Sequence, residues 1–236
     1  MNKVCLIIPV LNEEKNISKI YSQIKKISIK LKILFIDDNS TDNTKNEIFK
    51  LKKKNKNIFY ILRKNKIGIG SAHKDAIKWC YSKKFSTIIT MDCDGTHNPK
   101  YIPRMLEKSK LYDIIITSRF KKNNSISGWP WYRKIITILR LYITKIVLNI
   151  NYDTSGAYRC FNCKKISLKE FQDIKSNHYD FFFESIYVLH KKNYSIYEVP
   201  IDLPFRKLGK SKMEFKHIII YFLSLIRLRL RFLKIL

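Results

Sequence analysis

Two carboxylates one residue apart, Asp92 and Asp94, follow the run Ser86–Thr90, where a buried strand is expected to end. Carboxylates placed in this way can reach a hard divalent cation together with the phosphate oxygens that the cation bridges. Such a metal would reconcile the two acids with a chain whose formal net charge is +28. Because two acids in a loop are often only solvated, the pair predicts a metal–phosphate site only if other polar groups gather around it.

The elements that must position these acids are short apolar runs in the first half of the chain. They are rich in β-branched residues: Val4–Val10, Ile33–Ile36, Ile58–Leu62, Thr87–Met91 and Asp113–Thr117. Segments with helical spacing of apolar residues separate them. This alternation predicts an α/β fold with a mostly parallel sheet and helices on both faces. Polar residues follow each run, and ligands of such sheets bind beyond the carboxyl ends of the strands, so we expect these groups to converge.

The charge balance, 47 Lys and Arg against 19 Asp and Glu, has two readings that the sequence leaves open. It indicates an anionic partner, such as nucleic acid, phosphates or an acidic membrane face. Alternatively, it reflects a composition that is skewed toward Lys, Asn and Ile along the whole chain.

Three further patterns predict no site of their own. The glycine-rich stretch 66–72 fits neither common phosphate-binding pattern, since a dinucleotide fingerprint would need glycine at His73, and a tight turn opening a helix remains. Cys160 and Cys163 have no second cysteine pair to complete a zinc site, so we expect ordinary thiols in a reducing cytosol. We expect no signal peptide, because the short apolar start leads directly into an acidic segment.

The second half carries a long aromatic and apolar stretch from Trp129 to Ile150, and a further strand is expected at Tyr197–Ile201. The chain ends in the apolar run Ile218–Ile226, which is shorter than the ~20 residues that span a bilayer. Four cations follow this run: Arg227, Arg229, Arg231 and Lys234.

A helix in this C-terminal segment would place Leu225, Leu228 and Phe232 on one face and cations on another. The pattern favours an amphipathic helix whose apolar residues enter the membrane interface. The alternative is a helix packed on the domain with its arginines in water.

Seven short motifs follow one another along the chain. They are Ile8–Ile17, Ile36–Thr44, Gly68–Ala72, Met91–His97, Ser118–Arg119, Ser155–Gly156 and Arg206–Lys212. Together they resemble family 2 glycosyltransferases of the dolichyl- or polyprenyl-phosphate mannosyltransferase group, over nearly the whole chain. The resemblance implies a GT-A fold in residues 1–212, a nucleotide-sugar donor, Mg²⁺ or Mn²⁺, and inversion at the anomeric carbon. Residues 213–236 would then be the membrane-interface helix.

The resemblance also implies roles for single residues. Those that would cradle the base and ribose of the donor are Pro9, Leu11, Glu13, Ile36 and Asp38. Those that would line its diphosphate are Asp92, Cys93 and Asp94, with Asp94 as the principal metal ligand and Thr96 in the place of a second ligand. The basic residues expected near the diphosphate or the acceptor phosphate are Arg119, Arg133, Arg206 and Lys212.

The acceptor decides which catalytic groups the site needs. A hydroxyl acceptor needs a general base, whereas a lipid phosphate is already an anionic nucleophile and needs cations to position it. The downstream half offers such cations and no Gln-x-x-Arg-Trp element like that of polysaccharide-forming relatives. Asp153 and Glu184 are possible bases, although we favour structural carboxylates paired with neighbouring cations.

We therefore predict a peripheral enzyme on the cytosolic face of a membrane. It would transfer a hexose, with mannose favoured, from a nucleotide diphosphate sugar to a polyprenyl phosphate. One rival is an enzyme of the same fold acting on a hydroxyl or on a different lipid. The other is a basic nucleic-acid-binding module, which would leave the acids at the strand ends unexplained, so we expect no nucleic-acid partner.

Overall fold

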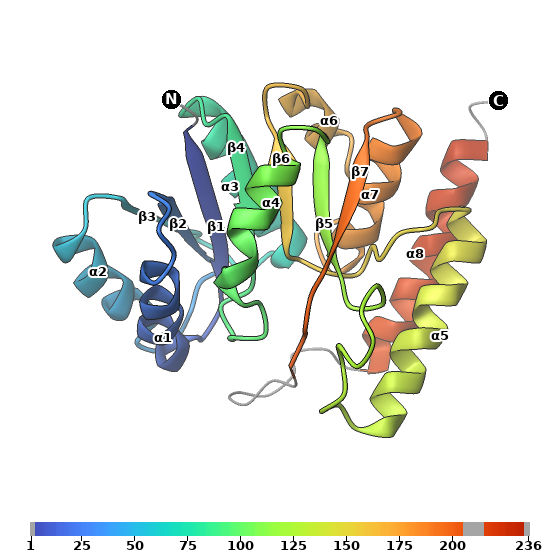
Figure 1. The fold of residues 1–236 in the computed structure, drawn as a ribbon, viewed down its shortest axis with the longest axis horizontal. Coiled ribbons are helices and arrows are strands. Elements are labelled where there is room, and N and C mark those ends of the chain that lie inside the picture. Colours follow the sequence, from blue (N-terminus) through green and yellow to red (C-terminus); the bar gives the residue numbers. More distant parts are fainter. Residues whose placement is uncertain (1–2, 205–214, 234–236) are drawn as a thin grey trace.

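The structure is a computed structural model that describes residues 3–204 and 215–233. Its centre is a seven-stranded sheet in the order β3-β2-β1-β4-β6-β5-β7 (Figure 1). The strands are β1 (Val4–Val10), β2 (Lys32–Asp37), β3 (Ile58–Leu62), β4 (Thr87–Thr90), β5 (Ile114–Ser118), β6 (Arg159–Asn162) and β7 (Ile196–Pro200). Neighbouring strands pair in parallel, except that β6 runs antiparallel to both β4 and β5. The predicted α/β fold with a mostly parallel sheet is confirmed.

Helices cover both faces of the sheet, as continuous apolar strands require. One face carries α1 (Glu14–Lys25), α2 (Thr44–Lys54) and, after the short 3₁₀ turn Pro99–Tyr101, α4 (Ile102–Lys108). The other carries α3 (Ile69–Ser82), α6 (Leu168–Gln172) and α7 (Asp180–Lys191). Successive residues of a strand point to opposite faces, so Ile7 and Ile8 of β1 belong to different cores. The β-branched runs therefore form a sheet buried on both sides.

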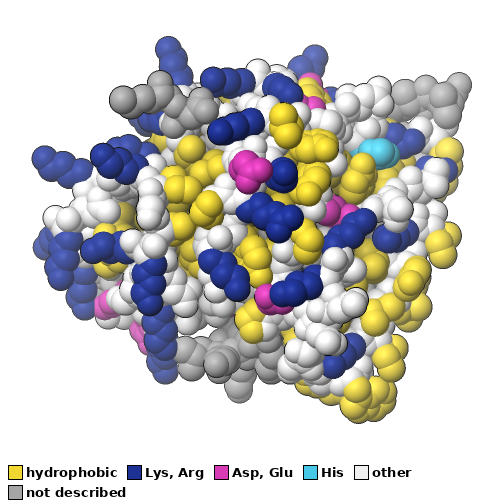
Figure 2. Space-filling model, in the orientation of Figure 1, with side chains coloured by type: hydrophobic (Ala, Val, Ile, Leu, Met, Phe, Trp, Pro, Cys, Tyr) yellow, Lys and Arg dark blue, Asp and Glu magenta, His cyan; other side chains and the backbone are white. Residues whose placement is uncertain are grey.

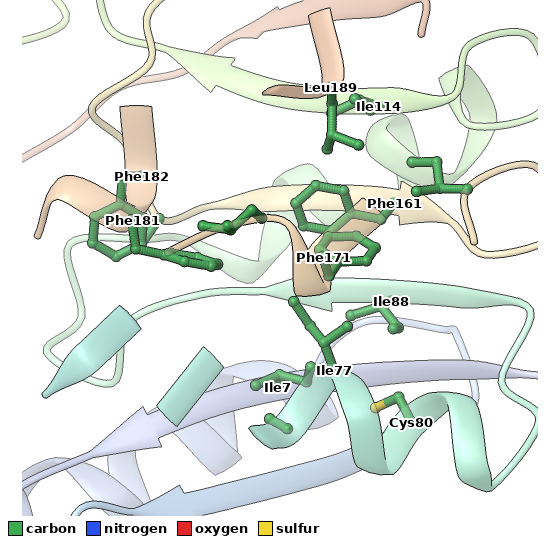
Figure 3. Close-up of a cluster of buried hydrophobic side chains, with 14 of the residues drawn as sticks. Ile7, Ile77, Cys80, Ile88, Ile114, Phe161, Phe171, Phe181, Phe182 and Leu189 are labelled. Carbon is green, nitrogen blue, oxygen red and sulfur yellow. The ribbon is translucent and has the colours of Figure 1, made fainter. Parts of the chain in front are cut away.

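Figure 3 shows the core on the α3, α6 and α7 face. Ile7 and Ile88 from β1 and β4 pack toward Ile77 of α3, and farther along the sheet Phe161 of β6 meets Phe171 of α6 edge to face at 5.2 Å. All five side chains are almost wholly removed from water. This core fixes the position of β4, whose carboxyl end carries the two acids.

The glycine-rich stretch serves helix packing. Gly68 has φ +123°, a conformation that favours glycine, and it is the N-cap residue directly before α3. A Cβ atom on Gly70 would lie 2.6 Å from the Cβ of Phe181. The predicted tight turn that opens a helix is confirmed, and its glycines allow α3 to approach α7 closely.

The strand β6 was not predicted. It has only four residues and carries two polar ones, Arg159 and Asn162, so it lacks the apolar pattern of the other strands. Cys160 and Cys163 lie in β6 and directly after it, where burial raises the pKa of each thiol to about 12. Both thiols therefore stay protonated near neutral pH, as the expectation of ordinary thiols requires.

Two long helices, α5 (Trp131–Leu148) and α8 (Phe215–Leu233), run side by side next to α7 (Figure 1). Leu225 and Leu228 of α8 are buried in a small core that includes Leu148 of α5 and Tyr187 of α7. Leu225 and Leu228, which were expected to enter a membrane, therefore pack on the protein instead, whereas membrane contact by residues 213–236 stays a prediction. Within the described residues, no helix combines the length and the apolar character that a membrane crossing needs.

Candidate active site

Polar groups that are far apart in the sequence meet in a cavity of about 250 Å³. Asp92 and Asp94 enter it from the segment after β4, and Arg119 from the end of β5. Because β6 is antiparallel, its amino end lies at the same edge and brings Ser155 and Gly156 into the lining. The predicted convergence of polar residues at the carboxyl edge of the sheet is thus confirmed on the β4–β5 side.

A tight turn holds the carboxylate of Asp94. The backbone N–H of Thr96 donates to Asp94 Oδ1 at 3.0 Å, and the Thr96 hydroxyl donates to the same oxygen at 2.7 Å. Gly95, between the two residues, has φ +81° and allows the chain to turn back on the carboxylate. Thr96 therefore orients the Asp94 carboxylate through two hydrogen bonds to one of its oxygens.

His97 fixes the backbone of the other acid. The Asp92 N–H donates to His97 Nδ1 at 2.9 Å, and the buried imidazole stacks on Tyr158 with ring centres 5.1 Å apart. Burial lowers the pKa of His97 to about 4, so the ring is neutral at pH 7 and Nδ1 remains an acceptor. His97 was not among the predicted site residues, although it lies three positions after Asp94.

The two acids fit a divalent metal that a ligand completes. Within the described residues, no group of three or more His, Cys, Asp or Glu side chains could hold a metal by itself. Mg²⁺ and Mn²⁺ do not require such a cage when one or two carboxylates bind them together with phosphate oxygens. Asp92 and Asp94 line the same cavity and are carboxylates of this kind.

Arg119 is a firmly anchored cation of the cavity. Its Nε lies 3.2 Å from Oδ2 of Asp153, and it also donates to the Ser155 hydroxyl at 3.2 Å. Burial alone would raise the pKa of the Asp153 carboxyl, but Arg119 and the hydrogen bonds from Ser155 hold this pKa below its ordinary value. Asp153 is thus an ionised partner of Arg119.

Glu184 is likewise committed to structure. Its carboxylate accepts the backbone N–H groups of Lys175 and Ser176 at 3.0 and 2.8 Å, and it pairs with Arg231 at 2.8 Å. Both acids that could have served as general bases are therefore paired with cations, which is the interpretation that the sequence favoured.

The predicted site residues separate into three groups. Those that line the cavity are Asp92, Asp94, Thr96, Arg119 and Arg133. Those that lie outside its lining are Pro9, Leu11, Glu13, Ile36, Asp38 and Cys93. Arg206 and Lys212 lie outside the described residues.

The residues assigned to the donor base and ribose lie in and directly after β1 and β2. Among them, Asp38 is buried: it pairs with Arg63 and accepts the N–H of Gly68 at 3.0 Å. Asp38 thereby links the end of β2 to the turn before α3. Glu13 is also buried and accepts from the Asn16 amide at 2.6 Å. A role of these residues in donor binding stays a prediction.

The cavity also contains residues that the sequence analysis did not single out. Trp129 and Arg140 reach it from the α5 region, and Tyr221 reaches it from α8. Arg140 is one of 47 basic residues in the chain, and no pattern around it marks it as different from the others. Its place in the cavity depends on how α5 packs against α8.

Comparisons with known proteins agree with this geometry. Residues 5–167 match the family described as glycosyl transferase family 2. An undecaprenyl-phosphate mannosyltransferase of Micrococcus luteus is 27% identical over 212 residues, which is 89% of this chain and 87% of the relative. A polyprenol monophosphomannose synthase of Mycolicibacterium smegmatis is 26% identical over 214 residues, covering 89% and 81% of the two chains.

A solved structure shows the same fold. The glucosyl-3-phosphoglycerate synthase of Mycobacterium tuberculosis, in complex with Mn²⁺, UDP and phosphoglyceric acid, superimposes with a TM-score of 0.70. The sequences are 12% identical, and the match covers 97% of this chain and 78% of the other. The chain therefore has the GT-A fold and belongs to glycosyl transferase family 2.

Proposed function

We propose that this glycosyltransferase transfers a hexose, with mannose favoured, from a nucleotide diphosphate sugar to a polyprenyl phosphate at the cytosolic face of a membrane. The observation that carries the proposal is the composition of the cavity, where two metal-capable acids share one space with three arginines. Membership of the family makes the chain an enzyme, so the nucleic-acid-binding module is no longer needed to account for the charge. The relatives named as mannosyltransferases of polyprenyl lipids support the acceptor.

In this proposal Asp94 is the principal ligand of a divalent cation, and Asp92 assists it. The bound cation would offset the negative charge that develops on the leaving diphosphate. Thr96 keeps the Asp94 carboxylate in place through two hydrogen bonds. His97 holds the Asp92 backbone while remaining uncharged, so it adds no competing positive charge beside the acids. The Asp94 carboxylate and the Asp92 backbone would thus need little rearrangement on binding.

The state of the carboxylates supports a phosphate acceptor. A general base must lie free to take a proton from an attacking hydroxyl. Asp153 and Glu184 are both held by arginines, and the pKa of Asp153 is lowered, which makes it a weak base. An acceptor that is already anionic requires only positioning, and Arg119 and Arg133 line the cavity for that purpose.

The exposed apolar surface supports contact with a membrane. Of the sixteen large hydrophobic side chains that are exposed among the described residues, eight lie on α5 and five on α8. Figure 2 shows hydrophobic side chains gathered along the edge where Figure 1 places α5. Trp131, Tyr132 and Tyr142 are among them, and such aromatic side chains favour membrane interfaces. We infer that α5 and the outer face of α8 together, rather than 213–236 alone, contact lipid.

The experiment that tests the function offers the purified protein a panel of labelled nucleotide sugars, with a polyprenyl phosphate in detergent and Mn²⁺. We expect label to enter the lipid fraction from one donor and to disappear on chelation. Labelled product from the same donor with an uncharged polyprenol but not with the phosphate would show that the acceptor is a hydroxyl. Absence of lipid product from every donor would contradict the proposal.

A further inference from the structure

Arg140 lines the cavity, and the proposed function assigns it no role. Its guanidinium lies over the ring of Tyr221 at 5.3 Å, which joins α5 to α8. The Thr144 hydroxyl lies 2.7 Å from the Arg140 carbonyl and 2.5 Å from the Tyr221 hydroxyl, so Thr144 ties the two residues together. Both Arg140 and Tyr221 line the cavity that contains Asp92 and Asp94. The arginine is therefore held at the α5–α8 side of the site.

The charge of Arg140 lacks the compensation that Arg119 has. Arg119 pairs with Asp153, whereas no carboxylate forms an ion pair with Arg140 among the side chains that the structure describes. Burial lowers the pKa of the Arg140 guanidinium, although an arginine is still charged at pH 7. A partly buried cation in this state is stabilised by an anionic ligand, and a guanidinium can bind two phosphate oxygens at once.

The helix that carries Arg140 also faces outward with its apolar side chains. Ile135, Leu139 and Tyr142 of α5 are about half exposed, while Arg140 lies on the cavity side. A phosphate attached to a hydrocarbon chain could place the chain along the outer face and the phosphate inside. The acids proposed to bind the metal, Asp92 and Asp94, come from a different element, the segment after β4, where the diphosphate of the donor is expected.

We infer that Arg140, held by Tyr221, binds the phosphate monoester of the acceptor and so selects a phosphate over a hydroxyl. The inference rests on the proposed function and adds a binding residue that the family resemblance did not assign. Tyr221 is a positioning residue in this account, because it contacts the guanidinium and not the acceptor. The phosphate could belong to a membrane lipid or to a soluble monoester, and the chemistry at Arg140 is the same for both.

The test compares Arg140→Met, Arg140→Lys and the matched control Arg104→Met, which removes an exposed arginine on α4 outside the cavity. We expect Arg140→Met to raise the KM for polyprenyl phosphate about ten- to a hundredfold, because a charge-assisted contact is lost. The acceptor KM of Arg140→Lys should lie between those of the wild type and Arg140→Met, since a point charge cannot form the bidentate contact. The donor KM should change less than about threefold, and Arg104→Met should match the wild type in both constants.

Tyr221 gives a second, independent pair of variants. Tyr221→Phe keeps the ring under Arg140 but loses the hydroxyl that contacts Thr144, so its acceptor KM should lie between those of the wild type and Tyr221→Leu. Tyr221→Leu removes the ring and should raise the acceptor KM in the direction of Arg140→Met. A Tyr221→Leu protein that remains folded, with an unchanged acceptor KM, would show that the ring does not position Arg140.

Two acceptors distinguish a membrane lipid from a soluble monoester as the source of the phosphate. They also distinguish failure of this inference from failure of the proposed function. They are polyprenyl phosphate in vesicles and a short, water-soluble isoprenyl phosphate. A raised KM for both in Arg140→Met supports phosphate binding, whereas a raised KM for the vesicle acceptor alone would mean that Arg140 acts on the membrane and would overturn the inference. Unchanged acceptor KM values in an active Arg140→Met enzyme would also overturn it. A wild-type enzyme that glycosylates neither phosphate would instead refute the proposed function.

Discussion

At the scale of single residues, we expect activity to be most sensitive to replacement of Asp94. Asp94→Asn retains an oxygen that can accept the two hydrogen bonds from Thr96, so the turn should persist. The loss of the carboxylate charge should lower turnover about a hundredfold or more, because the metal ligand is weakened. A Mn²⁺ titration of activity measures this. Near wild-type activity of Asp94→Asn after exhaustive chelation would contradict the metal role.

Thr96 allows its orienting role to be tested apart from metal ligation. Thr96→Ser keeps the hydroxyl that donates to Asp94, whereas Thr96→Val removes it at nearly constant volume. We expect Thr96→Val to weaken the apparent affinity for Mn²⁺ about ten- to a hundredfold, as is typical when the partner of a ligand is lost. Thr96→Ser should stay close to wild type. Equal Mn²⁺ affinities for Ser and Val would show that the hydroxyl does not orient the carboxylate.

Arg206 and Lys212 lie outside the described residues, and their contact with phosphates stays a prediction from the sequence. Replacement of either by Ala should lower kcat/KM by a factor that corresponds to a loss of about 2–5 kcal/mol of transition-state stabilisation, if the site excludes water. Arg206→Lys should restore only part of the loss. Unchanged kinetics with donor and acceptor in both Ala variants would make them surface cations.

The sequence could identify Asp92, Asp94 and Arg119 because they lie shortly after the ends of apolar strands. It could not identify His97 or Arg140 in the same way. The importance of His97 lies in one hydrogen bond to a backbone N–H, and that of Arg140 in a contact between two helices distant in sequence. Such tertiary contacts leave no periodic signal in the chain.

At the scale of elements, strands with β-branched runs were predictable almost to the residue, and β1 and β3 have the predicted bounds. β6 escaped prediction because its four residues are polar at both ends. Its Arg159 is fully buried and donates to the carbonyls of Gly156, Thr154 and Phe182, so its burial depends on tertiary hydrogen bonds. Amphipathic spacing found α8 but could not show which of its faces packs.

Helix α5 gives a prediction on membrane contact. The double variant Ile135→Ser, Leu139→Ser removes apolar surface that is already exposed, so it should leave thermal stability nearly unchanged. It should reduce flotation with anionic liposomes, because less apolar area enters the interface. Leu111→Ser is the matched control, since Leu111 is 70% exposed but lies after α4. Equal flotation of the double variant and the control would contradict the role of α5.

Helix α8 gives a prediction on stability. Removal of the chain from Arg227 onward takes away the buried Leu228 and Arg231, the ion-pair partner of Glu184, and should therefore lower the thermal stability of the protein. The milder change Arg231→Met leaves Glu184 with its two backbone donors but without a cation, and should lower the free energy of unfolding by about 1–3 kcal/mol. Arg227→Met is the control, because Arg227 is exposed. Chemical denaturation measures the free energy of unfolding of both variants. Equal denaturation midpoints for Arg231→Met and Arg227→Met would show that the ion pair adds no stability.

At the scale of the whole molecule, two buried imidazoles predict how stability depends on pH. Burial lowers the pKa of His73 and of His97 to about 4 from an ordinary 6.5. The unfolded chain therefore binds these protons first as the pH falls, so stability is complete above pH 6.5 and declines toward pH 4. His73→Gln should flatten this decline in urea titrations between pH 7 and 4. If stability falls equally with pH in the wild type and in His73→Gln, the protonation of His73 does not cause the decline.

The formal net charge of +28 and the apolar surface of α5 and α8 should act together at a membrane. Raised salt screens the attraction to anionic lipid but not the burial of apolar side chains. Liposome binding should therefore weaken with salt without disappearing. Complete release at high salt would mean that charge alone holds the protein at the surface.

If the enzyme acts as proposed, it transfers the sugar to a lipid phosphate only in the presence of a divalent cation. The most direct measurement offers the wild-type enzyme, its preferred nucleotide sugar and Mn²⁺ an equal mixture of a polyprenyl phosphate and the matching polyprenol, and then identifies the lipid product by mass spectrometry. We expect one product, the polyprenyl phosphate with one hexosyl residue added, and no product after chelation. A glycosylated polyprenol without phosphate, or equal product formation after chelation, would contradict the proposal.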